Sequence, residues 1–275
     1  MRRWSSLAFS LSLLSTATHA QSAPRDPTGA MPQFIRFADI FGGRLVAAFD
    51  SIPASKYGYR PVPTQQAIGY IAQHLENANY NLCERIGARF GVKHPRTAKD
   101  QLPDTVKAKW PKDTLVARLD ASLRFCDDVL VRLGPLDSSV VAANLLAFET
   151  DLAEHYSQIS VYMRLLGLVP PSALPPKQRT AIALPSSALA QLVGRYQLAP
   201  GWELTFTQTG DALFVRSSLG GDSLRVWPES ATSFFVKEAD AQIAVKRGAG
   251  GAVTAIVVHQ FNRERTATRI ASAKP

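Results

Sequence analysis

The hydrophobic pattern of this 275-residue chain changes at a proline-rich stretch that begins near residue 170. Before it, apolar residues recur every three or four positions, as on one face of a helix, and after it they alternate, as in strands. The length also suits two domains. We therefore predict a helical domain over residues 31–171, a stiff linker over 172–185 and an antiparallel β-domain over 186–271.

Four apolar stripes with helical spacing occupy the first domain. Segments of this kind bury their stripes most simply against one another, which predicts a four-helix bundle. The long polar connection between the second and third stripes, residues 87–113, has room for a short helix. The stripes consist of Phe34, Phe37, Phe41 and Leu45; Ile68, Ile71, Leu75, Ala78 and Leu82; Leu115, Leu119, Leu123, Cys126, Leu130 and Leu133; and Leu145, Phe148, Leu152, His155, Ile159, Tyr162 and Leu166.

Short strand-like runs separated by Gly, Asp or Asn fill the second domain. The first two flank Thr209-Gly210-Asp211, a typical hairpin turn. Their number and close spacing predict a small antiparallel β-barrel or sandwich. The runs cover residues 202–207, 213–216, 223–227, 233–237, 242–246, 253–260 and 265–270.

The N-terminus has the features of a secretory signal peptide. Arg2 and Arg3 precede an apolar run over residues 7–14, and Thr18-His19-Ala20 offers small residues for cleavage. We therefore expect residues 1–20 to be removed and the mature protein to be periplasmic or secreted. The apolar run is too short to span a bilayer, and we expect no membrane-spanning segment after it.

Charge restricts the class of partner. The chain has 31 basic and 22 acidic residues, and loss of residues 1–20 removes two of the basic ones, which leaves a net charge of +7. The basic residues are scattered, without a run of five, so we expect no nucleic-acid partner. A small-molecule ligand, an anionic surface and a homodimer remain open.

The two cysteines, Cys83 and Cys126, lie near the apolar faces of two predicted helices. In an exported protein this placement favours one disulfide between the helices. The alternative is a pair of buried free thiols, which behave as small apolar side chains.

Three side chains are candidate metal ligands. Asp151 and His155 are four residues apart and therefore share one face of the last predicted helix, and His74 lies on an earlier helix. Two imidazoles and one carboxylate suit zinc, nickel, manganese or ferrous iron. The simpler alternative is a buried histidine that only packs in the core, with Asp151 facing solvent.

Several motifs appear in the order typical of one family. They are Lys56-Tyr57-Gly58-Tyr59-Arg60-Pro61, the helix with His74 and residues 79–83, Glu154-His155-Tyr156 and Gly167-Leu168-Val169-Pro170-Pro171. Through them residues 31–171 resemble the DinB-like superfamily of four-helix metal-binding proteins. The resemblance implies a divalent metal held by three histidines, and it places His74 and His155 at two of these positions. Asp151 stands at the third, where the family has a histidine.

A second resemblance concerns the β-domain. Leu192-Val193-Gly194-Arg195-Tyr196 and Phe234-Phe235-Val236 are similar to the lipocalin-like module at the C-terminus of serine β-lactamase-related peptidases. The chain has no Ser-x-x-Lys motif with suitable partners, so we predict no peptidase activity.

The first resemblance implies a metal-dependent hydrolase or transferase that acts on a small molecule. Export favours hydrolysis, because a cytosolic thiol cofactor would not be at hand. The alternative is a non-catalytic envelope protein whose β-domain binds a ligand or partner. We assign no catalytic residue. We expect Glu154 to lie at the surface or to support a ligand residue rather than to act as a general base. Tyr156 and Arg164 should pack and pair at the helix surface, where either could orient a ligand. His94 and His259 should have surface or sheet-packing roles only.

Overall fold

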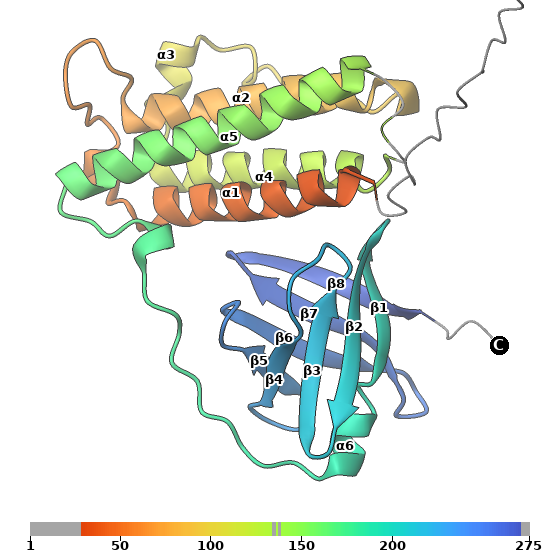
Figure 1. Ribbon diagram of the computed structural model, residues 1–275. Coiled ribbons are helices and arrows are strands. Elements are labelled where there is room, and N and C mark those ends of the chain that lie inside the picture. Colours follow the sequence, from red (N-terminus) through yellow and green to blue (C-terminus); the bar gives the residue numbers. More distant parts are fainter. Residues whose placement is uncertain (1–28, 134–135, 137–138, 271–275) are drawn as a thin grey trace, which may run out of the picture.

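The computed structural model describes residues 29–133, 136 and 139–270. A helical N-terminal part is followed by a closed, eight-stranded antiparallel β-barrel (Figure 1). The predicted signal peptide, residues 1–20, lies outside the described residues. None of the helices formed by the described residues has the length and apolarity needed to cross a membrane.

The described residues form six α-helices, of which four are long. Helices α1 and α2 each pack against both α4 and α5, so the four long helices surround a common core. Helix α3 lies in the long polar connection, as predicted. The helices are α1 (Met31–Ser51), α2 (Ile68–Ile86), α3 (Asp104–Lys107), α4 (Lys112–Leu130), α5 (Ser139–Leu165) and α6 (Ser186–Ala190).

Proline and glycine set the ends of the long helices. Helix α1 stops two residues before Pro53, and α4 starts directly after Pro111, where a missing N–H costs nothing. After α5, Gly167 adopts a positive φ of 74°, which lets the N–H of Leu168 donate to the carbonyl of Met163. The chain then leaves the helical part through Pro170 and Pro171.

Most of the predicted apolar stripes form the helical core. Its fully buried side chains include Leu45, Phe49, Ile71, Leu75, Leu119, Phe148, Leu152 and Ile159. The prediction for Phe37 is wrong, because this side chain is 44% exposed. Phe37 lies two residues after the buried Ile35, on the opposite side of α1. Within the core, a disulfide joins Cys83 of α2 to Cys126 of α4.

The barrel contains one strand more than the sequence predicted, β1. Each strand pairs with the next, and β8 pairs with β1 through Arg195 opposite Ile270. This closure selects a barrel over a sandwich. The strands are β1 (Gly194–Ala199), β2 (Trp202–Thr209), β3 (Ala212–Ser217), β4 (Leu224–Pro228), β5 (Ser233–Val236), β6 (Ala241–Arg247), β7 (Val253–Gln260) and β8 (Arg263–Ile270).

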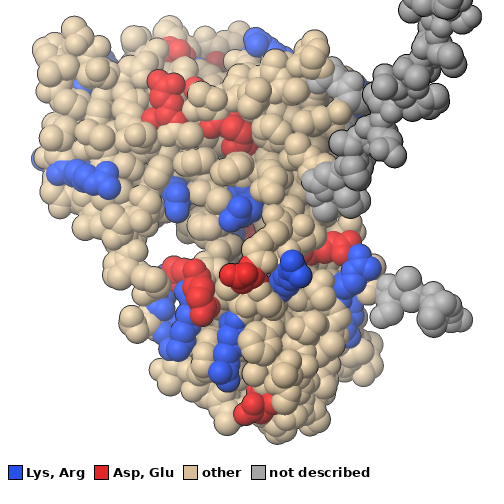
Figure 2. All heavy atoms as spheres, viewed as in Figure 1, with Lys and Arg blue, Asp and Glu red and all other residues tan. Residues whose placement is uncertain are grey.

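Helix α1 lies against one end of the barrel (Figure 1). Acidic and basic side chains gather along this boundary (Figure 2). Arg265 of β8 makes two hydrogen bonds to Asp39 of α1, at 2.6 and 2.8 Å, and Arg263 pairs with Asp120 and Asp127 of α4. Two arginines of one strand therefore connect the barrel to two helices.

Gly43 of α1 permits a close approach between the two parts. The turn between β7 and β8 passes so near that a Cβ atom at Gly43 would lie 1.7 Å from the carbonyl oxygen of Phe261. Only glycine fits there without displacing the turn. By contrast, a Cβ atom at the neighbouring Gly42 would meet the flexible end of the Leu123 side chain at 3.0 Å.

We expect Gly43→Ala to destabilise the protein by about 2 kcal/mol, the usual cost of overpacking, and Gly42→Ala to cost less. Both substitutions gain the same helix propensity, so Gly42→Ala is the matched control. Urea denaturation of the two variants measures the difference. Equal stabilities would show that the turn at Phe261 does not press on α1.

Candidate metal centre

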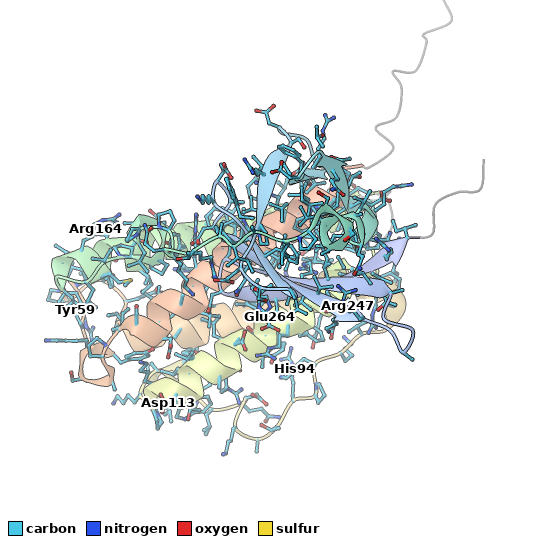
Figure 3. All side chains as sticks on the ribbon, turned by 90° about the horizontal axis from the view of Figure 1, so that it is seen from below. Tyr59, His94, Asp113, Arg164, Arg247 and Glu264 are labelled. Carbon is cyan, nitrogen blue, oxygen red and sulfur yellow. A yellow bond between two sulfur atoms is a disulfide. The ribbon has the colours of Figure 1, made fainter. Side chains whose placement is uncertain are left out.

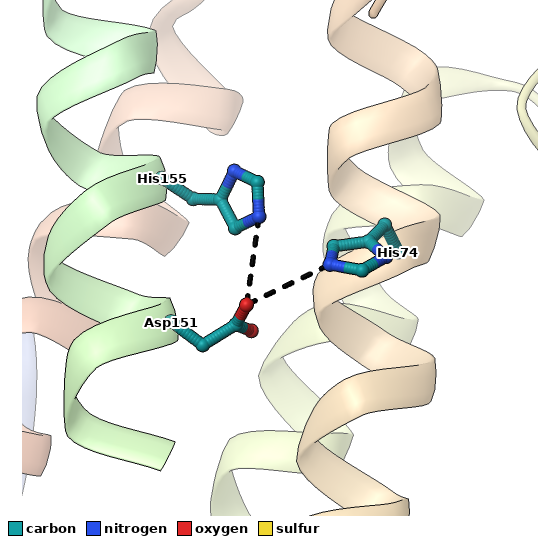
Figure 4. A group of neighbouring side chains, drawn as sticks. All are labelled: His74, Asp151 and His155. Carbon is teal, nitrogen blue, oxygen red and sulfur yellow. Dashed lines mark ion pairs between the residues drawn. The ribbon is translucent and has the colours of Figure 1, made fainter. Parts of the chain in front are cut away.

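Helices α2 and α5 bring the three predicted ligands together. His74 comes from α2, and Asp151 and His155 come from consecutive turns of α5 (Figure 4). One ligand atom from each residue lies within 4.8 Å of the other two. The i, i+4 spacing explains the pairing within α5, and the packing of α2 against α5 supplies the third side chain.

Two of the three distances between these atoms are longer than ordinary hydrogen bonds and close to those between metal ligands. Oδ1 of Asp151 lies 3.5 Å from Nε2 of His155 and 3.6 Å from Nε2 of His74. Hydrogen bonds between such groups are shorter, about 2.7–3.2 Å. Ligand atoms at about 2.0–2.1 Å from a tetrahedral ion lie about 3.3 Å apart, close to the two distances to Oδ1 of Asp151. All three ligand atoms lie within 4.8 Å of one another, so an ion would draw them together.

Asp151 also has an unused coordinating atom. Its Oδ2 is buried and has no hydrogen-bond partner among the described residues. A buried carboxylate oxygen without a partner is costly, and a cation would satisfy it. The donor set therefore fits a divalent metal ion.

A second layer of polar groups fixes the His155 ring. Its Nδ1 lies 2.9 Å from Oε1 of Gln158, and because an amide oxygen only accepts, Nδ1 carries the proton. Nε2 is then left with its lone pair facing Asp151. Gln158 in turn donates to the Tyr162 hydroxyl, which donates to the backbone carbonyl of Gln66. These contacts fix the orientation of the His155 ring from its Nδ1 side.

Electrostatics favours positive charge at this position. The Asp151 carboxylate raises the pKa of His74, although burial acts in the opposite direction. The His74 side chain is 37% exposed, compared with 11% for His155, so the centre opens to solvent on the His74 side. A cation would replace the proton that Asp151 favours on His74.

A polar hollow adjoins the centre. Thr64, Gln65 and Gln66, which precede α2, face Glu154, Ser157 and Gln158 of α5 around it, and His155 forms part of its wall. Nearby, the Tyr59 ring lies 6.0 Å from that of Tyr162. Seen from below, the barrel leaves the end of the helices near Tyr59 uncovered (Figure 3). The hollow is therefore accessible beside the barrel.

The other residues discussed from sequence lie as follows. Glu154 is exposed, as expected. Tyr156 packs and pairs, as expected, but its side chain is buried rather than at the helix surface, and its hydroxyl accepts a hydrogen bond from the N–H of Ser172. His94 stacks on Tyr80, and His259 pairs with Glu264 on the barrel. Sequence reasoning missed the role of Gln158. Its position three residues after His155 was the available signal.

Comparison of the chain with models of known protein families and with curated proteins gives no match.

Proposed function

We propose that the helical part binds one divalent metal ion through His74, Asp151 and His155, and that the protein is a metal-dependent hydrolase of a small polar molecule. The observation that carries the proposal is the approach of Nε2 of His74 and Nε2 of His155 to Oδ1 of Asp151, while Oδ2 of the same carboxylate is buried without a partner among the described residues. The pairing of four long helices, with ligands on α2 and α5, supports a DinB-like bundle in which Asp151 replaces the third histidine.

The residues around the centre would have the following roles. When bound, a divalent ion of this kind supplies Lewis acidity and lowers the pKa of a ligated water. His74, Asp151 and His155 hold three positions, and Gln158 keeps Nε2 of His155 unprotonated for binding. The amides of Gln65 and Gln66 border the hollow and would hydrogen-bond a polar substrate beside the centre. A transferase would use the same arrangement with an acceptor other than water.

We further propose that the protein is exported. The disulfide between Cys83 and Cys126 supports this, because structural disulfides persist mainly in oxidising compartments. The signal-peptide features of residues 1–20 support it as well.

The metal proposal predicts stoichiometric binding that depends on the three ligands. Protein purified without a metal-affinity tag should take up about one equivalent of Zn²⁺, Ni²⁺, Mn²⁺ or Fe²⁺ by elemental analysis after dialysis. Asp151→Ala and His155→Ala should lose this uptake, because two ligands rarely hold such an ion against dialysis. His259→Ala, which removes a histidine from the barrel surface, should keep it.

A panel of chromogenic esters and amides then tests hydrolysis. Activity should disappear with a chelator, return with the preferred metal and be absent in both ligand variants. If wild-type protein takes up no metal, the centre itself is refuted. If metal binds but no hydrolysis depends on it in a broad panel, the centre stands and the hydrolase assignment fails.

A further inference from the structure

A cavity of about 550 Å³ opens between the barrel and helix α1. Its volume lies within the range of small-molecule binding sites. None of its lining residues belongs to the metal centre or to the polar hollow. It is therefore a second, separate site, and nothing in the proposed hydrolase reaction uses it.

The barrel supplies the apolar wall of this cavity. Leu198, Val215, Val236 and Ile243 line it from four different strands, and each of these side chains is buried in the fold. Leu204 adds to the same wall. A ligand that reached this depth would have to be apolar, since a buried polar group would find few partners there.

Helix α1 and the strand ends supply polar groups at the other end. Asp39, Arg263 and Arg265 line the cavity there, but their charges are already paired across the boundary with the helices. Arg36 of α1 also lines it, is exposed, and has no ion-pair partner in the part of the chain that the structure describes. An unpaired guanidinium at the mouth of an apolar cavity is suited to a carboxylate.

Two further groups influence whether the cavity favours an anionic or a cationic ligand. Trp202 lines the cavity, and its buried Nε1 has no acceptor among the described residues, so a second donor is unsatisfied beside the cavity. Against this, Asp222 lies exposed on the rim and would repel an anion. Arg36 and Trp202 together offer donors to an acceptor, whereas Asp222 alone favours a cation.

We propose that this cavity binds an amphipathic monocarboxylate, with its apolar chain inside the barrel and its carboxylate at Arg36. The site is composite, because the barrel provides the chain pocket and α1 of the helical part provides the charged contact. A charge-assisted hydrogen bond from Arg36 to the carboxylate should account for about a tenfold difference in affinity, which corresponds to about 1.4 kcal/mol.

Calorimetric titration of the full chain with decanoate, decanol and decylamine tests the proposal. Decanoate should bind about tenfold more tightly than decanol, and Arg36→Gln should abolish this preference without changing the binding of decanol. Arg216→Gln is the matched control, because Arg216 is an exposed arginine next to Val215 on β3 and points away from the barrel interior. Val215→Trp, which fills the cavity, should weaken the binding of all three compounds.

Each remaining outcome overturns part of the proposal. If none of the three compounds binds, the cavity is not a site for such ligands. Equal affinities for decanoate and decanol would remove the role of Arg36, and tightest binding of decylamine would assign recognition to Asp222. If Val215→Trp fails to unfold cooperatively, its binding data cannot be used. The comparison of Arg36→Gln with Arg216→Gln then decides whether Arg36 recognises the carboxylate, since both positions are exposed and neither substitution should disturb the fold.

Discussion

Replacing both Cys83 and Cys126 by alanine is expected to lower the free energy of unfolding by about 4 kcal/mol. The disulfide closes a loop with a sequence separation of 43 and joins α2 to α4, two helices that pack directly against each other. In the chain-entropy account, the cross-link restricts the unfolded chain, and a loop of this length corresponds to about that energy. Both sulfurs are buried, so the alanines also lose some packing.

Urea denaturation of the double variant and of wild-type protein, with and without a reductant, measures the effect. The reduced wild-type protein should approach the stability of the variant, and the variant should not respond to reductant. A midpoint that stays unchanged in the variant would mean that the cross-link does not constrain the unfolded chain.

Replacing Glu149 by glutamine is expected to make the protein more stable at high pH. Both carboxylate oxygens of Glu149 are buried on α5 without a hydrogen-bond partner among the described residues. This burial, followed by the nearby charge of Asp39, raises the pKa of Glu149 to about 8, from 4.5. Between these two values the folded protein holds a proton that the unfolded chain has released, so folding must take up a proton.

The sign of the pH dependence follows from this proton uptake. Below about pH 4.5, Glu149 does not lower the free energy of unfolding. Between about pH 4.5 and pH 8 it lowers that free energy by about 1.4 kcal/mol for each pH unit, and above about pH 8 the loss stays constant. At pH 8.5 the total is on the order of 5 kcal/mol. Glu149→Gln removes the ionisable group and therefore this loss.

Denaturation of wild type and Glu149→Gln at pH 5 and pH 8.5 measures the change. The advantage of the variant should grow by several kcal/mol between the two values. Glu154→Gln, an exposed carboxylate on the same helix, should show no such growth. An advantage that stays constant with pH would show that Glu149 ionises normally in the folded protein.

Most of the fold could be predicted from the periodic spacing of apolar residues along the chain. All of the predicted stripe of α4, from Leu115 to Leu130, is buried, because one face of that helix meets α1 and α2. The same reasoning wrongly predicted that Phe37 of α1 is buried. This helix also contacts the barrel, and the spacing of its apolar residues does not predict that contact. Strand β1 was not predicted, although it is longer than β4 and β5. It begins at Gly194, and its pairing with β2 shifts register between Gln197 and Ala199.

The candidate centre could be predicted only in part. The spacing of Asp151 and His155 places them together on any helix. The position of His74 beside them depends on how α2 packs, so the sequence offered His74 as a candidate ligand and only the family resemblance supported its place. The contact from Gln158 to His155 needs a particular side-chain conformation that spacing alone does not define. The cavity beside Arg36 could not be predicted from the sequence, because it forms only where α1 contacts the barrel.

Strand β8 has a consequence for the order in which the molecule assembles. It closes the barrel against β1, and its Arg265 bonds to Asp39 across a separation of 226 residues. The ribosome makes this strand after all the others, and contacts between such distant residues form late in folding. The helices can pack before β8 is in place, but their barrel-facing surface must then stay uncovered. Barrel closure and its attachment to the helices become one late event, completed only after β8 has been synthesised.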